Sequence, residues 1–413
     1  MKPAPAQAQW MRRSHRYRLQ RYWSGAGGKY FPVEIHGRRY DVLRVSGGWD
    51  GAEKTATDCL DWSLAVDEDD WTARFLNALG WMCRSKSKFP EAIEYFDRAR
   101  HLYQSRGDSS GIGSVLGNIG TCYLEQGDFD RAMQYFERQR GVVEEINDRA
   151  GCCHVLANIG TIHWNRGRYE EAEKLFNQSL ALAQQLGNLY DQGRILARLG
   201  NLKFRQQKIS EALWHYARYL RCSLKIGDRQ GVGIACGNIG IVCAQRGKHR
   251  QALNFFQRAT AMAAALGDMR SLASAKGNMA QLGLEMGEYE RARQLLGEQI
   301  SIVRSINDRR GLSIAYGNLG ELHLKTGDYR EADLALLEAI ALDRQLGLAP
   351  YLCVDLQRRA QAQFKLGNII EARALNLEAK NIAAEVNSEE TLVLARELEA
   401  KIGRTQGSQK SPK

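Results

Sequence analysis

The sequence has 413 residues, of which 44% are apolar and 25% are charged, an ordinary composition for a folded protein in water. No apolar run approaches the roughly 18 residues of a membrane-spanning helix, and residues 1–20 show no signal-peptide pattern, so we expect neither a membrane span nor secretion. The nine cysteines include no CxxC pair, which predicts reduced thiols in a cytoplasmic protein. The net charge of +11 lies at the two ends, because residues 1–50 contribute +7 and residues 401–413 contribute +4.

Residues 1–50 form a basic N-terminal extension, with 10 Lys and Arg against 3 Asp and Glu. Arginines mix with aromatic residues between Trp10 and Trp23, a composition found at contacts with nucleic acid or acidic surfaces. A solvated extension, or a contact to a partner or to a second copy of the chain, fits the same residues. Because the rest of the chain is neutral, we do not expect nucleic acid as the main partner. Residues 30–45 alternate apolar and polar, which predicts a short hairpin.

Residues 51–70 are expected to form a capping helix, and residues 71–387 contain eight copies of a 40-residue repeat. One column is alanine in every copy: Ala92, Ala132, Ala172, Ala212, Ala252, Ala292, Ala332 and Ala372. Twelve residues earlier the column is small: Gly80, Gly120, Gly160, Gly200, Gly240, Ala280, Gly320 and Ala360. Four residues after the alanine it is mostly large: Phe96, Phe136, Phe176, Tyr216, Phe256, Leu296, Leu336 and Asn376.

Each copy divides into two helical halves, for example residues 114–126 and 129–146. Glycine ends the first half in six copies: Gly127, Gly167, Gly247, Gly287, Gly327 and Gly367. Glycine or asparagine ends the second half: Gly107, Asn147, Gly187, Gly227, Gly267, Asn307, Gly347 and Asn387. Both residues tolerate the left-handed backbone that closes a helix. Asp or Asn follows in six copies and predicts an N-cap: Asp108, Asp148, Asn188, Asp228, Asp268 and Asp308.

The columns predict how the helices pack. We expect the small column to face the alanine column across each helix pair, and the large column to fill the space between successive repeats. Stacked helix pairs give an all-α, right-handed superhelical solenoid with a concave inner face. Residues 388–402 are expected to form a C-terminal capping helix, and residues 403–413 a disordered basic tail.

The order of these columns resembles the tetratricopeptide repeat (TPR) signature over residues 71–387. The 40-residue period, with the segments GDRQGVGIACGNIG and NDRRGLSIAYGNLG, looks most like the long-repeat subclass of the LGN/Pins adaptors and, more distantly, like kinesin light chain. The resemblance implies a solenoid that binds other proteins. Two features depart from it: no G-protein-binding motif follows the array, and the eighth copy is degraded at Arg359, Ala360 and Asn376.

An asparagine column two residues before the small column is the main functional candidate. It comprises Asn118, Asn158, Asn238, Asn278 and Asn318. A side-chain amide has both a donor and an acceptor, so a row of amides can hold the main chain of an extended peptide. The alternative is that these residues bond to the neighbouring repeat. The TPR resemblance implies ligand contact, because asparagine at this place contacts peptide backbone in several TPR adaptors.

Arginine replaces asparagine in this column at Arg198 and Arg358. With Arg194 and Arg205 on the same helix, Arg198 predicts a basic cluster for an acidic or phosphorylated ligand, although a solvated face fits equally well. Asn201, one turn further along, completes the candidate peptide-binding set.

The sequence contains no recognisable catalytic motif and no P-loop, and Cys236 and Cys243 lack the further ligands of a zinc site. We therefore predict a non-enzymatic scaffold or adaptor that uses no metal or cofactor and binds an extended peptide segment of a protein partner. The alternative is a regulatory or sensor solenoid whose basic arm contacts nucleic acid or an acidic partner. Homo-oligomer formation is left open.

Overall fold

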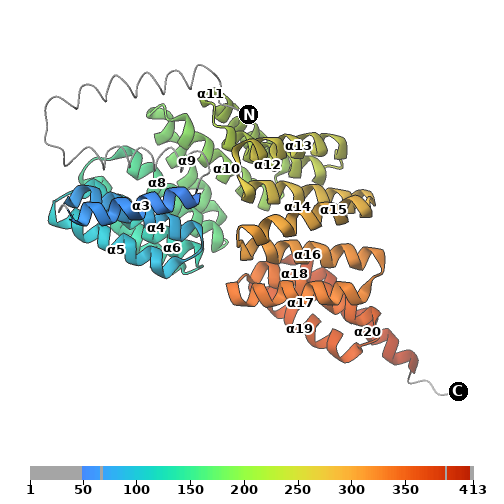
Figure 1. Cartoon of the computed structure of the whole chain (residues 1–413). Coiled ribbons are helices and arrows are strands. Elements are labelled where there is room, and N and C mark those ends of the chain that lie inside the picture. The colour runs from blue at the N-terminus through green and yellow to red at the C-terminus, as the bar shows by residue number, and fades with distance from the viewer. Residues whose placement is uncertain (1–48, 66–67, 387, 410–413) are drawn as a thin grey trace. The chain divides into compact units, whose positions relative to one another are not determined.

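The computed structural model describes residues 49–65, 68–386 and 388–409, and these residues form 18 α-helices with no strand among them (Figure 1). The predicted all-α fold is confirmed. The predicted hairpin at residues 30–45 and the basic segment from Trp10 to Trp23 lie outside the described residues. Among the described helices, none has both the length and the apolar character that crossing a bilayer requires.

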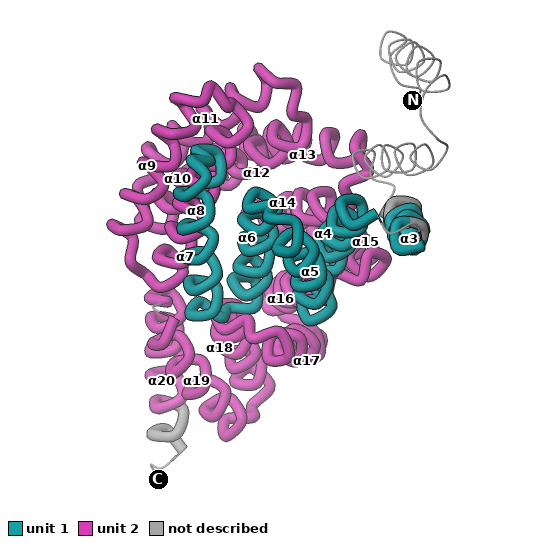
Figure 2. The backbone as a smooth tube through the Cα atoms, turned by 90° about the vertical axis from the view of Figure 1, so that its left-hand side faces the viewer, with its two compact units in different colours: residues 1–151 teal, residues 152–413 magenta. Residues whose placement is uncertain are grey.

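The chain divides into two compact units, Met1–Gly151 and Cys152–Lys413 (Figure 2). The described helices of unit 1 are α3 (Trp49–Ala65), α4 (Asp69–Ser85), α5 (Phe89–Ser105), α6 (Ser109–Glu125) and α7 (Phe129–Glu145). The division falls inside α8 (Arg149–Asn165). Unit 2 continues with α9 (Tyr169–Gln185), α10 (Leu189–Arg205), α11 (Ile209–Ile226), α12 (Arg229–Gln245), α13 (His249–Leu266), α14 (Met269–Met286), α15 (Tyr289–Ser305), α16 (Arg309–Thr326), α17 (Tyr329–Leu346), α18 (Ala349–Lys365), α19 (Ile369–Glu385) and α20 (Glu389–Gln409).

Each copy of the sequence repeat is one pair of helices, from α4/α5 as repeat 1 to α18/α19 as repeat 8. The helices α3 and α20 stand before and after the pairs and contact α4 and α19. Helix α20 continues to Gln409, so residues 403–409 extend the capping helix and do not belong to the predicted disordered tail.

The two glycine columns take the left-handed backbone that the sequence predicts. All six glycines that end the first helix of a pair have positive φ, from +69° to +87°. Ser87 and Gln207, which replace glycine in the other two copies, are forced into the same region, at φ +59° and +58°. Asn147 and Asn307 also have positive φ in the second column, whose last member, Asn387, lies outside the described residues. The repeat therefore imposes this backbone even where the side chain opposes it.

The predicted N-caps also form. All six side chains accept a hydrogen bond from a backbone N–H three residues later: Asp108, Asp148, Asn188, Asp228, Asp268 and Asp308. Each cap satisfies one N–H that the first turn of a helix leaves without a partner.

The alanine column is fully buried in all eight repeats, as its regularity suggested. The expectation that the small column faces these alanines is wrong, because it faces the large column. A Cβ on Gly120 would lie 2.7 Å from the ring of Phe136, and a Cβ on Gly240 would lie 2.6 Å from Phe256. A methyl group at these positions would clash with the ring, so glycine allows the aromatic side chain to pack closely against the first helix of the pair.

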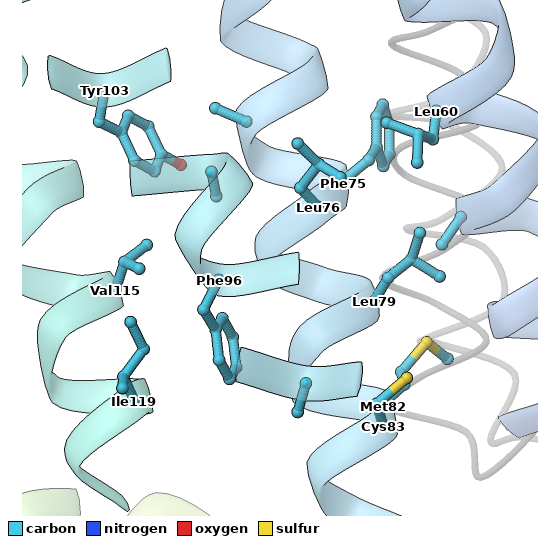
Figure 3. Packing of buried hydrophobic residues seen from close by; sticks show 14 of the residues in the cluster. Leu60, Phe75, Leu76, Leu79, Met82, Cys83, Phe96, Tyr103, Val115 and Ile119 are labelled. Carbon is cyan, nitrogen blue, oxygen red and sulfur yellow. The ribbon is translucent and has the colours of Figure 1, made fainter. Parts of the chain in front are cut away.

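The large column fills the space between successive repeats, as predicted. Figure 3 shows the ring of Phe96 between α4 and α6, with Leu76 and Leu79 on one side and Val115 and Ile119 on the other. The five aromatic side chains of this column are each at most 3% exposed: Phe96, Phe136, Phe176, Tyr216 and Phe256. Burial of such a ring contributes several kcal/mol, so this column accounts for much of the coupling between repeats.

Candidate functional site

The asparagine column lies on the first helix of each pair, and all five of its asparagines are half-buried. They differ in whether the side-chain amide forms a hydrogen bond with another side chain of the protein. In unit 1, Asn118 Nδ2 donates to Asn77 Oδ1 at 2.9 Å, so this amide is used to join repeats 1 and 2.

In repeat 4 the arginine of this column bonds back to repeat 3. Nη1 of Arg198 donates to the carbonyl of Ala157 and to Oγ1 of Thr161 at 3.1 Å, and Nη2 donates to Oδ1 of Asn158 at 3.2 Å. Burial, and then the nearby charge of Arg194, lower the pKa of Arg198 to about 10, so the guanidinium remains charged at neutral pH. The side chains of Asn158 and Arg198 are therefore hydrogen-bonded to each other.

In repeat 8 the second arginine of the column repeats this arrangement. Nη1 of Arg358 donates to the carbonyl of Gly317 at 3.4 Å, and Nη2 donates to the carboxylate of Glu321. The two arginines reach back to equivalent positions of the preceding repeat. For the arginines, and for Asn118 and Asn158, the structure therefore gives the inter-repeat bonding that the alternative interpretation expected.

Three asparagines remain between the two arginines. Within the described residues, the side-chain amides of Asn238, Asn278 and Asn318 make no hydrogen bond to another part of the chain. They occupy the same place on α12, α14 and α16, which are the first helices of repeats 5, 6 and 7. We call these three residues the open Asn row. A half-buried amide without a partner in the protein is available to a ligand.

The remaining candidates lie on α10, one repeat before the open row. Asn201 Oδ1 accepts a hydrogen bond from the hydroxyl of Tyr216 at 2.7 Å, because repeat 4 has tyrosine where four other repeats have phenylalanine. Arg194 and Arg205 are exposed, and neither forms an ion pair within the described ranges. The guanidinium of Arg194 lies 5.8 Å from the centre of the Tyr190 ring.

Asp191 is a buried acidic group beside these arginines, and no sequence pattern marked it as a candidate. Its carboxylate lies 3.0 Å from Nε2 of His154. Burial alone would raise the pKa of Asp191, but the hydrogen bond and charge of His154 and the charge of Arg194 outweigh it and lower the pKa. Asp191 therefore bonds to His154 and also interacts with the charge of Arg194.

A hollow adjoins the open row between α12, α13 and α14. Asn238 and Asn278 both line it, together with the apolar side chains of Ile234, Ile241 and Met262. Ile234 and Ile241 are 41% and 36% exposed, which is unusual for isoleucine. Polar amides and exposed apolar side chains thus converge at one place in unit 2. Among the described residues, no group of three His, Cys, Asp or Glu side chains is placed to hold a metal ion.

The repeat geometry agrees with the comparison against protein families. The tetratricopeptide-repeat family model matches residues 86–145, 111–185, 151–225, 191–265 and 271–345, which together cover more than half of the sequence. The chain belongs to the tetratricopeptide-repeat family. The narrower resemblance to LGN/Pins adaptors and kinesin light chain is not confirmed by these comparisons. A search of curated proteins found no significant match.

Solved structures share the TPR fold at low sequence identity. A Rap protein complexed with Competence and Sporulation Factor is 15% identical, with a TM-score of 0.61 over 86% of this chain and 99% of that one. The apo quorum sensor NprR from B. thuringiensis is 14% identical, with a TM-score of 0.56 over 85% and 98%. The Rap conjugation gene regulator of plasmid pLS20, in complex with the Phr* peptide, is 14% identical, with a TM-score of 0.56 over 76% and 95%. At these identities the likeness shows the fold alone.

Proposed function

We propose that this TPR protein is a non-enzymatic binding protein that holds an extended peptide segment of a protein partner along α12, α14 and α16. The observation that carries the proposal is the open Asn row, three equivalent half-buried amides without a partner in the described part of the chain. Each amide can donate to a carbonyl and accept from an N–H of the same peptide unit. Such contacts hold a main chain largely without regard to its side chains.

Two further observations support a peptide as the ligand. Exposed Ile234 and Ile241 flank Asn238 on α12, so apolar side chains are available next to the main-chain contacts. In addition, a structural neighbour with this fold, the pLS20 regulator, was solved in complex with a peptide. In repeats 2, 3, 4 and 8 the residue of the asparagine column bonds to a neighbouring repeat. The amides in repeats 5 to 7 make no such bond, so they are free to bind a ligand.

We further propose that the bound segment is acidic. Arg194, Arg205 and Arg229 are exposed on α10 and α12 and form no ion pair within the described residues. The neighbouring carboxylates are held inside the chain, since Asp191 bonds to His154 and Asp268 caps α14 through the N–H of Ser271. The three guanidinium groups are therefore free to bind acidic side chains of a ligand, and arginine binds carboxylates by paired hydrogen bonds.

The proposal is tested with the full chain and a phage library of random twelve-residue peptides. The most enriched sequence is synthesised with a fluorescent label, and its affinity is measured by anisotropy for the wild type and for N238A, N278A and N318A. Each single change should weaken binding by roughly threefold to tenfold, since one hydrogen bond contributes about 0.5–1.5 kcal/mol. The triple variant should bind no peptide at micromolar concentrations.

Asn118→Ala is the matched control, because Asn118 occupies the same column but bonds to Asn77 in unit 1. It should leave peptide affinity unchanged. Thermal unfolding of the triple variant should match the wild type, because the row contributes no hydrogen bond to the described structure. Unchanged affinity in a folded triple variant would show that the peptide binds elsewhere, and failure to enrich any peptide that depends on the row would overturn the proposed function.

A further inference from the structure

The hollow beside the open Asn row arises from a particular pair of small residues. In repeat 2, Gly117 on the first helix faces Gln139 on the second, and a Cβ on this glycine would lie 2.5 Å from the glutamine amide. Repeat 6 has the same pair, with a Cβ on Gly277 placed 2.6 Å from Gln299. Both glutamines are buried. In these repeats the long side chain fills the room that glycine leaves.

Repeat 5 lacks the filling side chain. Gly237 occupies the glycine position, but its partner position holds Ala259, and a Cβ on Gly237 would meet nothing within 4 Å. In repeat 7 the corresponding glycine, Gly317, is covered instead by the carboxyl of Asp355, 2.8 Å from where its Cβ would be. Gly237 is therefore the one glycine of this described column that faces open space. The result is a pocket of about 190 Å³, which we call the repeat-5 pocket.

The size and lining of the repeat-5 pocket define what fits it. Ligand sites for drug-sized molecules occupy about 300–1,000 Å³, so this pocket suits a single side chain. Ala259, Met262 and Ile234 give it an apolar wall, and methionine adapts its shape readily to a guest. Asn238 and Asn278 line the same pocket, so a side chain inside it would leave its own main chain beside the amides.

The charges at the pocket favour an acidic neighbour of that side chain. Arg229 lines the pocket, is exposed and has no ion pair within the described residues. Asp268, which lines the same pocket, accepts hydrogen bonds from Ser271 and, at 3.1 Å, from Nε2 of Gln230, so its carboxylate is held at the start of α14 and forms no ion pair with Arg229. A carboxylate on the ligand would complement Arg229.

We infer that the repeat-5 pocket is a specificity site for one large aliphatic side chain of an acidic peptide, an inference that rests on the proposed function and names its preferred ligand. Leucine, isoleucine or methionine would lie against Ala259 and Met262, and an adjacent aspartate or glutamate would reach Arg229. The small pair Gly237 and Ala259 sets this preference.

The test fills the pocket with the side chain that the protein uses elsewhere. Ala259→Gln recreates in repeat 5 the Gly–Gln pair of repeats 2 and 6, so the fold should be retained, and its thermal unfolding is checked against the wild type. The phage selection is repeated on this variant. Wild type should enrich peptides with one aliphatic position next to an acid, whereas A259Q should lose the aliphatic preference. The enriched wild-type peptide should bind A259Q at least tenfold more weakly.

A direct probe uses N-acetyl-leucinamide, followed through the methyl resonance of Met262 in protein labelled with ¹³C-methyl methionine. The leucine compound should shift this resonance in the wild type and leave it unmoved in A259Q, and N-acetyl-glycinamide should have no effect on either. Gln139→Ala, which alters a Gly–Gln pair in unit 1, is the control and should bind the enriched peptide as the wild type does. If A259Q keeps both the aliphatic preference and the affinity while the triple Asn variant loses binding, the pocket inference fails and the proposed function stands. If no peptide binding depends on the open row, the proposed function fails.

Discussion

Nη2 of Arg198 lies 3.2 Å from Oδ1 of Asn158, which precedes it by one full repeat. The same guanidinium bonds to the carbonyl of Ala157, so it joins α8 to α10 through both a side chain and the main chain. We expect Arg198→Ala to lower the free energy of unfolding by about 1–3 kcal/mol, because it leaves half-buried acceptors without a donor. Urea unfolding measures the loss, and hydrogen exchange should place it in α8 and α10.

Arg194→Ala serves as the comparison for this change. Arg194 is one turn away and exposed, so its removal should leave stability within about 0.5 kcal/mol of the wild type. If R198A were as stable as R194A, the contact between repeats 3 and 4 would contribute nothing measurable.

A second prediction concerns the contact between glycine and the aromatic ring. Gly240→Ala should destabilise unit 2 by about 1–3 kcal/mol, because the new methyl group would lie 2.6 Å from the ring of Phe256. Repeat 6 combines Ala280 with Leu296 at these two positions, and both are buried. The double variant G240A/F256L should therefore be more stable than the sum of the two single changes predicts. A double-mutant cycle from urea unfolding measures this coupling, and strict additivity would contradict the assigned contact.

A third prediction uses Gln207, one of the described residues other than glycine that take the left-handed backbone. Gln207 has φ +58° in a column that is otherwise mostly glycine, and a residue with a Cβ pays about 1–2 kcal/mol for this conformation. Gln207→Gly should raise the free energy of unfolding by up to about 1 kcal/mol. The gain is smaller than the strain removed, because glycine is also more flexible in the unfolded chain. The reverse change, Gly247→Gln, should lower it. Opposite signs in thermal unfolding are the expected result, and a loss of stability in both variants would contradict it.

A fourth prediction concerns pH. Asp343 and Asp355 share a hydrogen bond inside repeats 7 and 8, at positions that are apolar in most other repeats. Asp355 is 4% exposed, and burial raises its pKa to about 7; the charge of Arg358 opposes this shift and the carboxylate of Asp343 adds to it. Burial also raises the pKa of Asp343, against the hydrogen bonds from Ser313 and Asp355.

The folded protein therefore keeps a proton on Asp355 between about pH 4 and pH 7 that the unfolded chain releases. Stability should fall as the pH rises through this window and level off above it. Asp355→Asn, which retains the shape without the ionisation, should flatten this part of the curve and increase stability at pH 8. Urea unfolding at a series of pH values measures the slope, and an unchanged slope in the variant would exclude Asp355 as its source.

The helix pairs, their left-handed ends and their N-caps follow from the sequence because each depends on a residue type at a fixed place, such as Asp228 before α12. The sequence did not predict which column of the opposite helix the glycine column faces. Gly120 and Ala132 share a period, but the period does not tell which side chain of the opposite helix lies nearest, and the ring of Phe136 takes that place.

The candidate site shows the same limit more clearly. The sequence places Asn158 and Asn238 in one column and treats them alike, although Arg198 occupies only the first. That difference arises because the long side chain of Arg198 bonds to a residue of the preceding repeat, which is 40 positions earlier in the sequence. The repeat-5 pocket was missed for a related reason, since the signal required comparing Gly237 with Ala259 in a second column. The coincidence of two small residues in one copy is visible in the sequence once the pairing is known.

The open Asn row ends at Arg198 on one side and at Arg358 on the other, so a bound segment meets three amides and one pocket. Contacts this few set a modest affinity, with a Kd of about 1 µM. At an ordinary association rate of about 10⁶ M⁻¹ s⁻¹, such a complex lasts about one second. Occupancy would then follow the concentration of the partner from moment to moment. On the proposed function, the two arginines limit the length of the row, so that the bound segment would exchange quickly and would not be stored.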